Sequence, residues 1–139
     1  MLFLNIKDGK ISKNVDNNEV LSKVESIIKK YNPRKIFTHS RLDPHIDHRG
    51  VNKITLGVID KLNYKGDVYA FEVWNVVKED MPAMYVNITP YFKKKIKAMK
   101  MFRSQLHFIY FLLIPVYWRA VFYGMKNSCR YAEKFYKIK

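Results

Sequence analysis

Hydrophobic residues recur along the chain with two different spacings, and these spacings predict alternating helices and strands. A repeat of 3.6 residues indicates an amphipathic helix, and Asn17 or Asn18 can cap the first such repeat. This helix is expected to end at Asn32-Pro33, because the residue before a proline avoids the helical region. The three predicted helices cover approximately residues 18–31, 48–62 and 89–106.

Short β-prone segments lie between these helices. The predicted strands are Met1–Ile6, Lys35–His39, Val68–Trp74 and Met84–Ile88, and Tyr131–Ile138 has no clear preference. Strands that alternate with helices at such spacings are typical of βαβ units. The sequence therefore predicts an α/β fold with a mainly parallel sheet, and the absence of a linker predicts a single domain over residues 1–139.

The chain is strongly basic, with 26 Lys and Arg against 12 Asp and Glu and a net charge of +14. The densest lysine cluster, Lys93 to Lys100, alternates with apolar residues at helical spacing and indicates the solvated face of a helix. No nucleic-acid-binding motif accompanies it, so nucleic acid is not expected as the main partner. Cys129 is the single cysteine, which excludes an internal disulfide. A single cysteine and the lack of a secretory signal at the start of the sequence favour a cytoplasmic location.

The longest apolar stretch, Phe108 to Trp118, is interrupted by Pro115. A membrane-spanning helix needs about 20 apolar residues, so this stretch is too short to span. We interpret it as a core helix or loop. Peripheral contact with a membrane surface is the alternative, because aromatic and basic residues side by side suit an interface.

Candidate chemistry is concentrated in Asp43-Pro44-His45-Ile46-Asp47-His48-Arg49, directly after a predicted strand and at the start of a helix. Ligands bind at this edge of open α/β sheets, and imidazole with carboxylate suits a zinc hydrolase. A purely structural interpretation is also open, in which Asp47 caps the helix and Asp43-Pro44 forms a turn. We interpret His39 and His107 as structural histidines.

This segment, together with Thr38-His39-Ser40, resembles the second conserved motif of the LmbE/PIG-L family of zinc-dependent de-N-acetylases. Further similarities occur in the family's order along nearly the whole chain. They are Ile6–Ile11 with its Asp8-Gly9 turn, Val68–Trp74, Lys97-Ala98 with Ser104-Gln105, and Ala132-Glu133-Lys134-Phe135.

The resemblance implies a Rossmann-like layered fold and hydrolysis of the acetamide of an N-acetylglucosamine-containing conjugate by metal-bound water. By resemblance, His48 is a zinc ligand, His45 is a catalytic residue that faces the substrate, and Asp47 orients the site. Zinc would polarise the carbonyl and lower the pKa of its water.

The family's first motif, His-Pro-Asp-Asp-Glu, does not occur, since none of the five prolines precedes paired aspartates. We therefore expect an incomplete domain without the first strands of its sheet, with an unpaired edge. Such a chain would be inactive alone, a homo-oligomer, or one part of a split enzyme whose other half-chain supplies the missing ligands. The alternative is a non-catalytic remnant that acts as a basic interaction module for an anionic partner or membrane surface.

Overall fold

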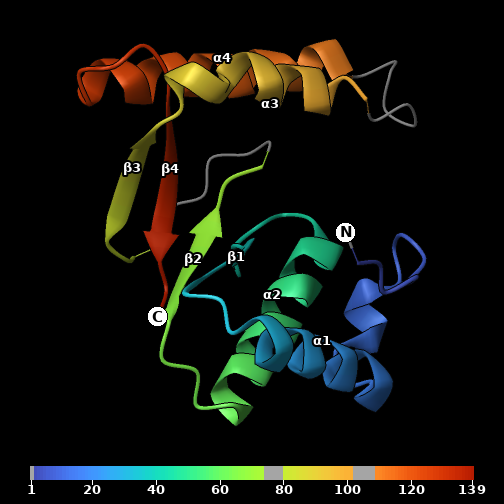
Figure 1. The fold of residues 1–139 in the computed structure, drawn as a ribbon. Helices are drawn as coiled ribbons and strands as arrows, with labels where there is room; N and C mark the ends of the chain where they lie inside the picture. Colours follow the sequence, from blue (N-terminus) through green and yellow to red (C-terminus); the bar gives the residue numbers. More distant parts are fainter. Residues whose placement is uncertain (1, 74–79, 102–108) are drawn as a thin grey trace. The chain divides into compact units, whose positions relative to one another are not determined.

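A computed structural model describes residues 2–73, 80–101 and 109–139 (Figure 1). These residues form two compact units. The first comprises residues 2–72, 80–82 and 136–139, and the second comprises 73, 83–101 and 109–135. Whether the whole chain behaves as a single domain stays a prediction, and each unit is described by itself.

Three helical segments build the first unit: the 3-10 turn η1 (Ile11–Asn14), α1 (Asn18–Tyr31) and α2 (Ile46–Lys61). The Asn17 side chain accepts hydrogen bonds from two amides of the first turn of α1. Asn32 adopts a left-handed conformation with φ 38° and ends the helix before Pro33. These local signals confirm the first predicted helix. The second begins at Ile46, two residues earlier than expected.

The strands of this unit are β1 (Lys35–His39) and β2 (Asp67–Phe71). They pair in parallel, with Lys35 opposite Asp67 and His39 opposite Phe71. The end of β4 (Ala132–Lys137) continues alongside β2, where the Val68 amide donates to the Lys139 carbonyl at 2.9 Å. Since α2 connects β1 to β2, this part is the βαβ unit that the alternation predicted.

The core of the first unit lies between its helices and strands. Ile59 and Val68 are fully buried, and Tyr64 donates its hydroxyl hydrogen to the Pro33 carbonyl oxygen at 2.7 Å. The other buried members of this cluster are Ile28 and Val58. This packing fixes α2 against the sheet and so fixes the first turn of α2 near the end of β1.

The second unit contains β3 (Ala83–Asn87), η2 (Thr89–Tyr91), α3 (Phe92–Met99), α4 (Ile109–Lys126) and most of β4. An aromatic cluster holds it together: the rings of Phe92 and Tyr131 stack at 3.9 Å, and the hydroxyls of Tyr117 and Tyr131 lie 3.0 Å apart. Figure 1 shows α3 and α4 side by side.

The described strands follow the order β1-β2-β4-β3, with one parallel pair in a mostly antiparallel sheet. The expected α/β class is therefore confirmed, but the expected mainly parallel sheet is wrong. Among the described residues, α3 and α4 both lie between β3 and β4, so the chain returns to the end of the sheet that it left and β4 runs antiparallel to β3 (Figure 1).

Several boundaries differ from the predictions. Residues 2–6 form no strand, and helix α3 ends at Met99. Three positions with predictions lie outside the described residues: Trp74, the last residue of the third predicted strand, Leu106, the predicted end of the third helix, and His107, interpreted as a structural histidine. The apolar stretch after 108 is helical through Pro115, as part of α4. None of the described helices is both long and apolar enough to cross a bilayer.

Ile59 tests the core of the first unit. Replacing this fully buried side chain with alanine should lower the free energy of unfolding by about 2–5 kcal/mol, because it leaves a cavity, whereas Ile59→Val should cost about 1 kcal/mol. Urea denaturation measures both. Ile46→Ala is the control, since Ile46 is 53% exposed and should change stability by less than about 0.5 kcal/mol. Equal losses at both sites would contradict the assigned core.

Glu25 predicts an acid-dependent part of the stability. Hydrogen bonds from Lys29 and then Lys61 lower the pKa of Glu25 from 4.5 to about 2. A carboxyl whose pKa is lower in the folded state stabilises the fold above its unfolded pKa, so this stabilisation is lost as the pH falls from 4.5 towards 2. Thermal melts should therefore show that Glu25→Gln is less stable than the parent at neutral pH and that the difference disappears near pH 2.

Glu19→Gln is the matched control, because Glu19 pairs with Lys23 alone and is far more exposed. It should show a smaller pH-dependent difference. A Glu25→Gln difference that stays constant across this pH range would contradict the assigned ion pairs.

Candidate metal centre

The end of β1 and the start of α2 are held together by buried polar contacts. The Asn52 side chain, 4% exposed, donates to the His39 carbonyl oxygen at 2.8 Å. One turn further along α2, the Thr55 hydroxyl lies 3.3 Å from that of Thr38. These contacts fix where β1 delivers the His39 side chain relative to the helix.

The connection over residues 40–45 is organised around Asp43. This carboxylate is buried, and its Oδ1 accepts a hydrogen bond from the His45 amide at 2.8 Å. The Arg49 guanidinium donates to the backbone oxygens of Asp43 and Pro44 at 2.7 and 2.9 Å. The loop is therefore tied to the first turns of α2 on both sides of the carboxylate.

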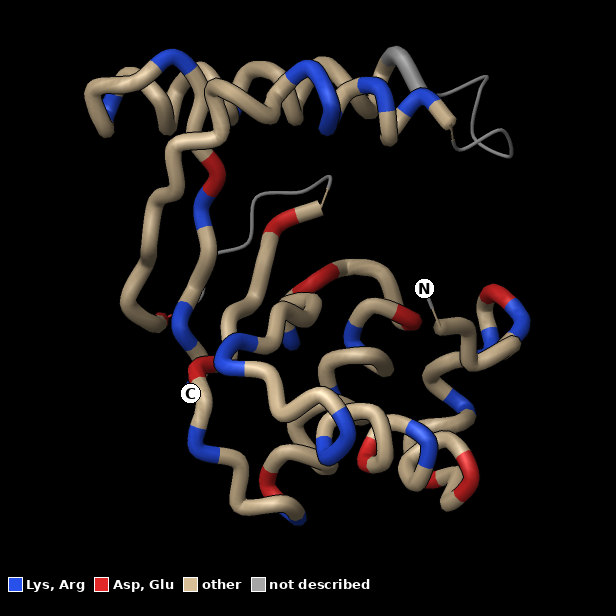
Figure 2. Tube along the Cα trace, in the orientation of Figure 1, with Lys and Arg blue, Asp and Glu red and all other residues tan. Residues whose placement is uncertain are grey.

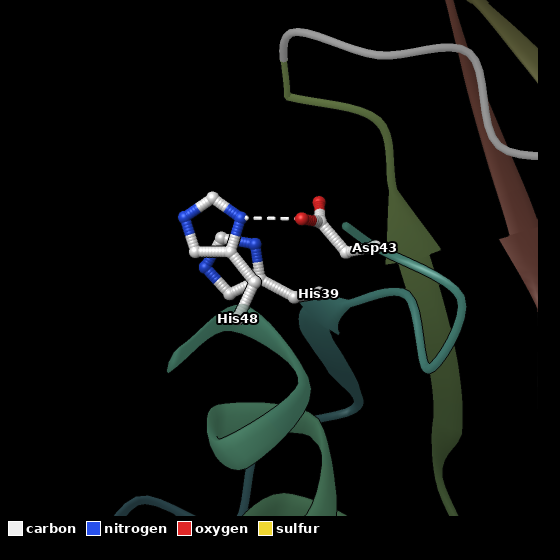
Figure 3. Close-up of side chains that lie close together, drawn as sticks. All are labelled: His39, Asp43 and His48. Atoms are coloured by element: carbon white, nitrogen blue, oxygen red, sulfur yellow. Dashed lines mark ion pairs between the residues drawn. The ribbon is translucent and has the colours of Figure 1, made fainter. Parts of the chain in front are cut away.

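Three potential metal ligands converge here: His39, Asp43 and His48 (Figure 3). One ligand atom from each lies within 4.8 Å of the others. The rings of His39 and His48 stack at 4.0 Å with 6° between their planes, and His48 Nδ1 lies 2.9 Å from Asp43 Oδ1. The end of a strand, a loop and the first turn of a helix thus contribute one donor each.

The donor atoms of this cluster fit a divalent cation. Nδ1 of His39 and Nδ1 of His48 are both buried and neither makes an aligned hydrogen bond, although His48 lies close to Asp43. Buried polar atoms are rarely left unpaired without a function. Burial, followed by the positive charges of the neighbouring histidines, lowers the pKa of His39 to about 4, which keeps the ring neutral near pH 7. Neutral imidazoles with a carboxylate form a donor set that zinc binds well.

His45 adjoins this cluster without joining it. Its ring centre lies 4.6 Å from that of His48, and its Nδ1 accepts a hydrogen bond from the Asp47 amide at 3.2 Å as the cap of α2. An imidazole that accepts at Nδ1 carries its proton on Nε2 when it is neutral. The exposed ring therefore offers an Nε2–H donor next to the candidate centre.

Asp47 makes a different set of contacts. Its carboxylate is 2% exposed and accepts hydrogen bonds from the amides of Gly9, Ile11 and Ser12 at 2.6, 3.1 and 3.3 Å. It anchors η1 to the first turn of α2, so the interpretation of Asp47 as the helix cap is wrong, because His45 occupies that position.

Sequence reasoning identified His48 but missed two of its neighbours. His39 was interpreted as structural, and Asp43 belonged to the candidate segment but was given no role beyond a possible turn, whereas the structure brings both next to His48. Their signal in the sequence was position: His39 ends a strand and Asp43 lies in the loop that follows. Among His45, Asp47 and His48, the structure places the first and third together and turns Asp47 towards η1.

The fold and this cluster define an α/β protein with a candidate metal centre at the junction of β1 and α2. Residues 1–59 match the family described as PIG-L: GlcNAc-PI de-N-acetylase. The resemblance to the PIG-L (LmbE-like) family that the motifs indicated is thereby confirmed, and the matched segment includes the whole candidate centre. No curated protein sequence matches the chain significantly.

Solved structures share the fold at low sequence identity. The conserved protein TT1542 from Thermus thermophilus has a TM-score of 0.77 and 18% identity, over 98% of this chain and 64% of that one. The zinc-inhibited form of teicoplanin deacetylase Orf2 has a TM-score of 0.70 and 18% identity, over 99% of this chain and 56% of that one.

The fold is also similar to that of a 4-carboxy-2-hydroxymuconate hydratase from Pseudomonas putida, with a TM-score of 0.70 and 19% identity, over 88% of this chain and 59% of that one. The chain spans less than two thirds of each of these three structures. Since a deacetylase and a hydratase share the fold, the fold alone does not define the reaction.

Asp47 is expected to act through structure. Asp47→Ala should lower the free energy of unfolding by about 1–3 kcal/mol, because it leaves the part-buried amides of Ile11 and Ser12 without this acceptor. Hydrogen exchange should show lost protection at the Gly9, Ile11 and Ser12 amides. Asp8→Asn is the control: Asp8 also accepts from the Gly9 amide but is exposed, so little should change. Unchanged protection in Asp47→Ala would contradict the anchoring role.

Proposed function

We propose that this chain carries part of the active centre of a zinc-dependent hydrolase of the deacetylase kind, which cleaves the acetamide of an N-acetylglucosamine-containing conjugate. The observation that carries the proposal is the convergence of His39, Asp43 and His48, with two buried imidazole nitrogens that lack aligned hydrogen bonds. The family match over residues 1–59 supports the substrate class.

In this proposal, His39, Asp43 and His48 would hold zinc, which would polarise the amide carbonyl and activate water. His48 is the ligand that the resemblance implies, and the other two complete a donor set of three, as catalytic zinc sites use. Asp43 is already held by the His45 amide and Arg49 holds its loop, so the carboxylate does not need to be ordered by the ion.

His45 would act on the substrate. Its ring packs beside His48, and its Nε2–H could donate a hydrogen bond to the developing oxyanion. Protonation of the leaving amine, the alternative role, would require the ring first to take up a proton at Nδ1 and to give up the hydrogen bond from the Asp47 amide. Asp47 would be a positioning residue, because its contacts with η1 fix the first turn of α2, from which both histidines project.

The carboxylate base is the missing part. The resemblance assigns it, together with further His and Asp metal ligands, to the His-Pro-Asp-Asp-Glu motif, which this sequence does not contain. The base would therefore come from a segment outside these residues or from a separate half-chain, because a second copy of this chain would lack the same motif. Among the described strands, β1 is at the edge of the sheet, where such a partner could add a strand. A cytoplasmic location stays a prediction.

A non-catalytic interaction module is the alternative function. It is favoured by the long basic segment of the second unit, which holds none of the candidate metal ligands. This alternative requires no affinity for a cation at His48.

Cation binding separates the two functions. Calorimetric titration of the metal-free chain with Zn²⁺ should give one high-affinity site, and Co²⁺ should give the visible spectrum of a nitrogen- and oxygen-ligated ion. His39→Ala and His48→Ala should each weaken the affinity by at least about tenfold, since loss even of a residue that supports a ligand costs that much.

His45→Ala is the matched control. It should keep the affinity for zinc but abolish acetate release from N-acetylglucosamine conjugates, assayed with a polypeptide that supplies the His-Pro-Asp-Asp-Glu segment. Zinc affinity that is equal in the parent and in His48→Ala would overturn the proposed centre. Intact zinc binding without acetate release under complementation would retain the centre and reject the deacetylase assignment.

A further inference from the structure

Helix α4 exposes an apolar stripe. Five large hydrophobic side chains recur at helical spacing along its outer side and are 50–76% exposed: Phe111, Ile114, Trp118, Phe122 and Met125. At about 3.6 residues per turn they fall within an arc of about 80°, and they extend over about 21 Å of helix. We call these residues the α4 stripe.

The opposite side of α4 is packed. Val116, Ala120 and Tyr123 are buried, and Ala120 contacts the cluster of Phe92 and Tyr131. The stripe is therefore the side of α4 that the described part of the second unit leaves uncovered. Contiguous exposed apolar surface of this kind marks a site of interaction.

The segment that carries the α4 stripe is rich in positive charge. Residues 81–139 contain twelve Lys and Arg and one acidic residue, Glu133, which pairs with Lys95 of α3. Helix α3 packs beside α4 through the rings of Phe92 and Tyr117. Lys93, Lys94 and Lys97 of α3 are exposed, and so is Lys100, which directly follows this helix. At the end of the stripe, Lys126 Nζ lies 4.3 Å from the centre of the Phe122 ring. Figure 2 shows Lys and Arg along both helices.

This charge belongs to one part of the chain. The part of the chain after residue 80 has twelve Lys and Arg but one acidic residue. The part up to residue 80 has fourteen Lys and Arg and eleven Asp and Glu, so its charges nearly balance. The basic character predicted from composition is thus mainly a property of the segment that carries the α4 stripe.

The combination favours one kind of partner. A second copy of the chain would bring two sets of like charges together around the stripes, which is unfavourable. The phosphates of a nucleic acid could pair with the lysines. They would provide no apolar surface to bury the exposed Phe, Trp, Ile and Met side chains of the stripe. A membrane surface with anionic headgroups satisfies both, since aromatic and aliphatic side chains enter the acyl boundary while lysines meet the headgroups.

We infer that the second unit binds the surface of anionic phospholipid membranes through the α4 stripe and the lysines of α3. The helix lies on the membrane, in agreement with the finding that no described helix could cross one. This inference is independent of the proposed chemistry at His48, because every residue that carries it lies outside the candidate centre.

Vesicle binding tests the inference. The sequence has two tryptophans, so in a Trp74→Phe background the fluorescence reports Trp118. Vesicles of phosphatidylcholine and phosphatidylglycerol in equal parts should shift its emission to the blue and sediment the protein, and phosphatidylcholine alone should bind at least about tenfold more weakly. Added salt should release the protein, because each lysine near the surface contributes about fivefold to binding.

Two pairs of variants separate specific from general effects. Lys93→Gln with Lys97→Gln should weaken binding by about 10–30-fold, whereas Lys13→Gln with Lys30→Gln, which removes the same charge from the first unit, should change it by less than about threefold. Phe122→Ala should weaken it by about tenfold, and Tyr31→Ala, at an exposed aromatic residue of the first unit, should not. Circular dichroism and thermal melts should confirm that each variant is folded.

Three results would overturn the inference. The first is equal binding to neutral and anionic vesicles. The second is no vesicle binding combined with tight, salt-sensitive binding of duplex DNA. The third is a dimer in sedimentation experiments that Phe122→Ala dissociates.

Discussion

The short connection over residues 40–45 is the constraint on which the candidate centre depends. Strand β1 ends at His39 and α2 begins at Ile46, so the last residue of the strand and the first turn of the helix must lie close together. Two imidazoles stack 4.0 Å apart as a result, and the carboxylate of Asp43 in the connection closes the group. Packing of Ile59 and Val58 against the sheet prevents the helix from moving away.

The first turn of α2 sends its side chains in different directions because successive helical residues are about 100° apart. Asp47 turns towards η1 and is satisfied by backbone amides, while His45 and His48 project together towards the end of β1. Of the three residues, Asp47 therefore anchors the helix to η1, while His45 and His48 are free of that structural task. Residue type alone could not make this division, since aspartate is equally suitable as cap, ligand or base.

Local signals predicted the parts of the fold that local interactions determine. Asn17 and Asn32-Pro33 marked both ends of α1, and Lys35–His39 was predicted to the residue. The direction of the sheet was not predictable in this way, because it depends on how many helices the chain places between paired strands. The same limit applies to the site. His39 was interpreted as structural and Asp43 had no assigned ligand role. The unusual property of the site, buried imidazole nitrogen without an aligned hydrogen bond, arises only where strand and helix meet.

The net charge of the chain, by contrast, became informative only once the charged residues were located along the sequence. A net charge of +14 is compatible with an anionic partner, yet the acidic residues are almost all before residue 81 and the candidate centre lies among them. The net charge is about +3 before residue 81 (fourteen Lys and Arg against eleven Asp and Glu) and about +11 after residue 80 (twelve against one). The charge is therefore better explained by the surroundings of the α4 stripe than by the chemistry of His48, and the two properties of this chain can change independently.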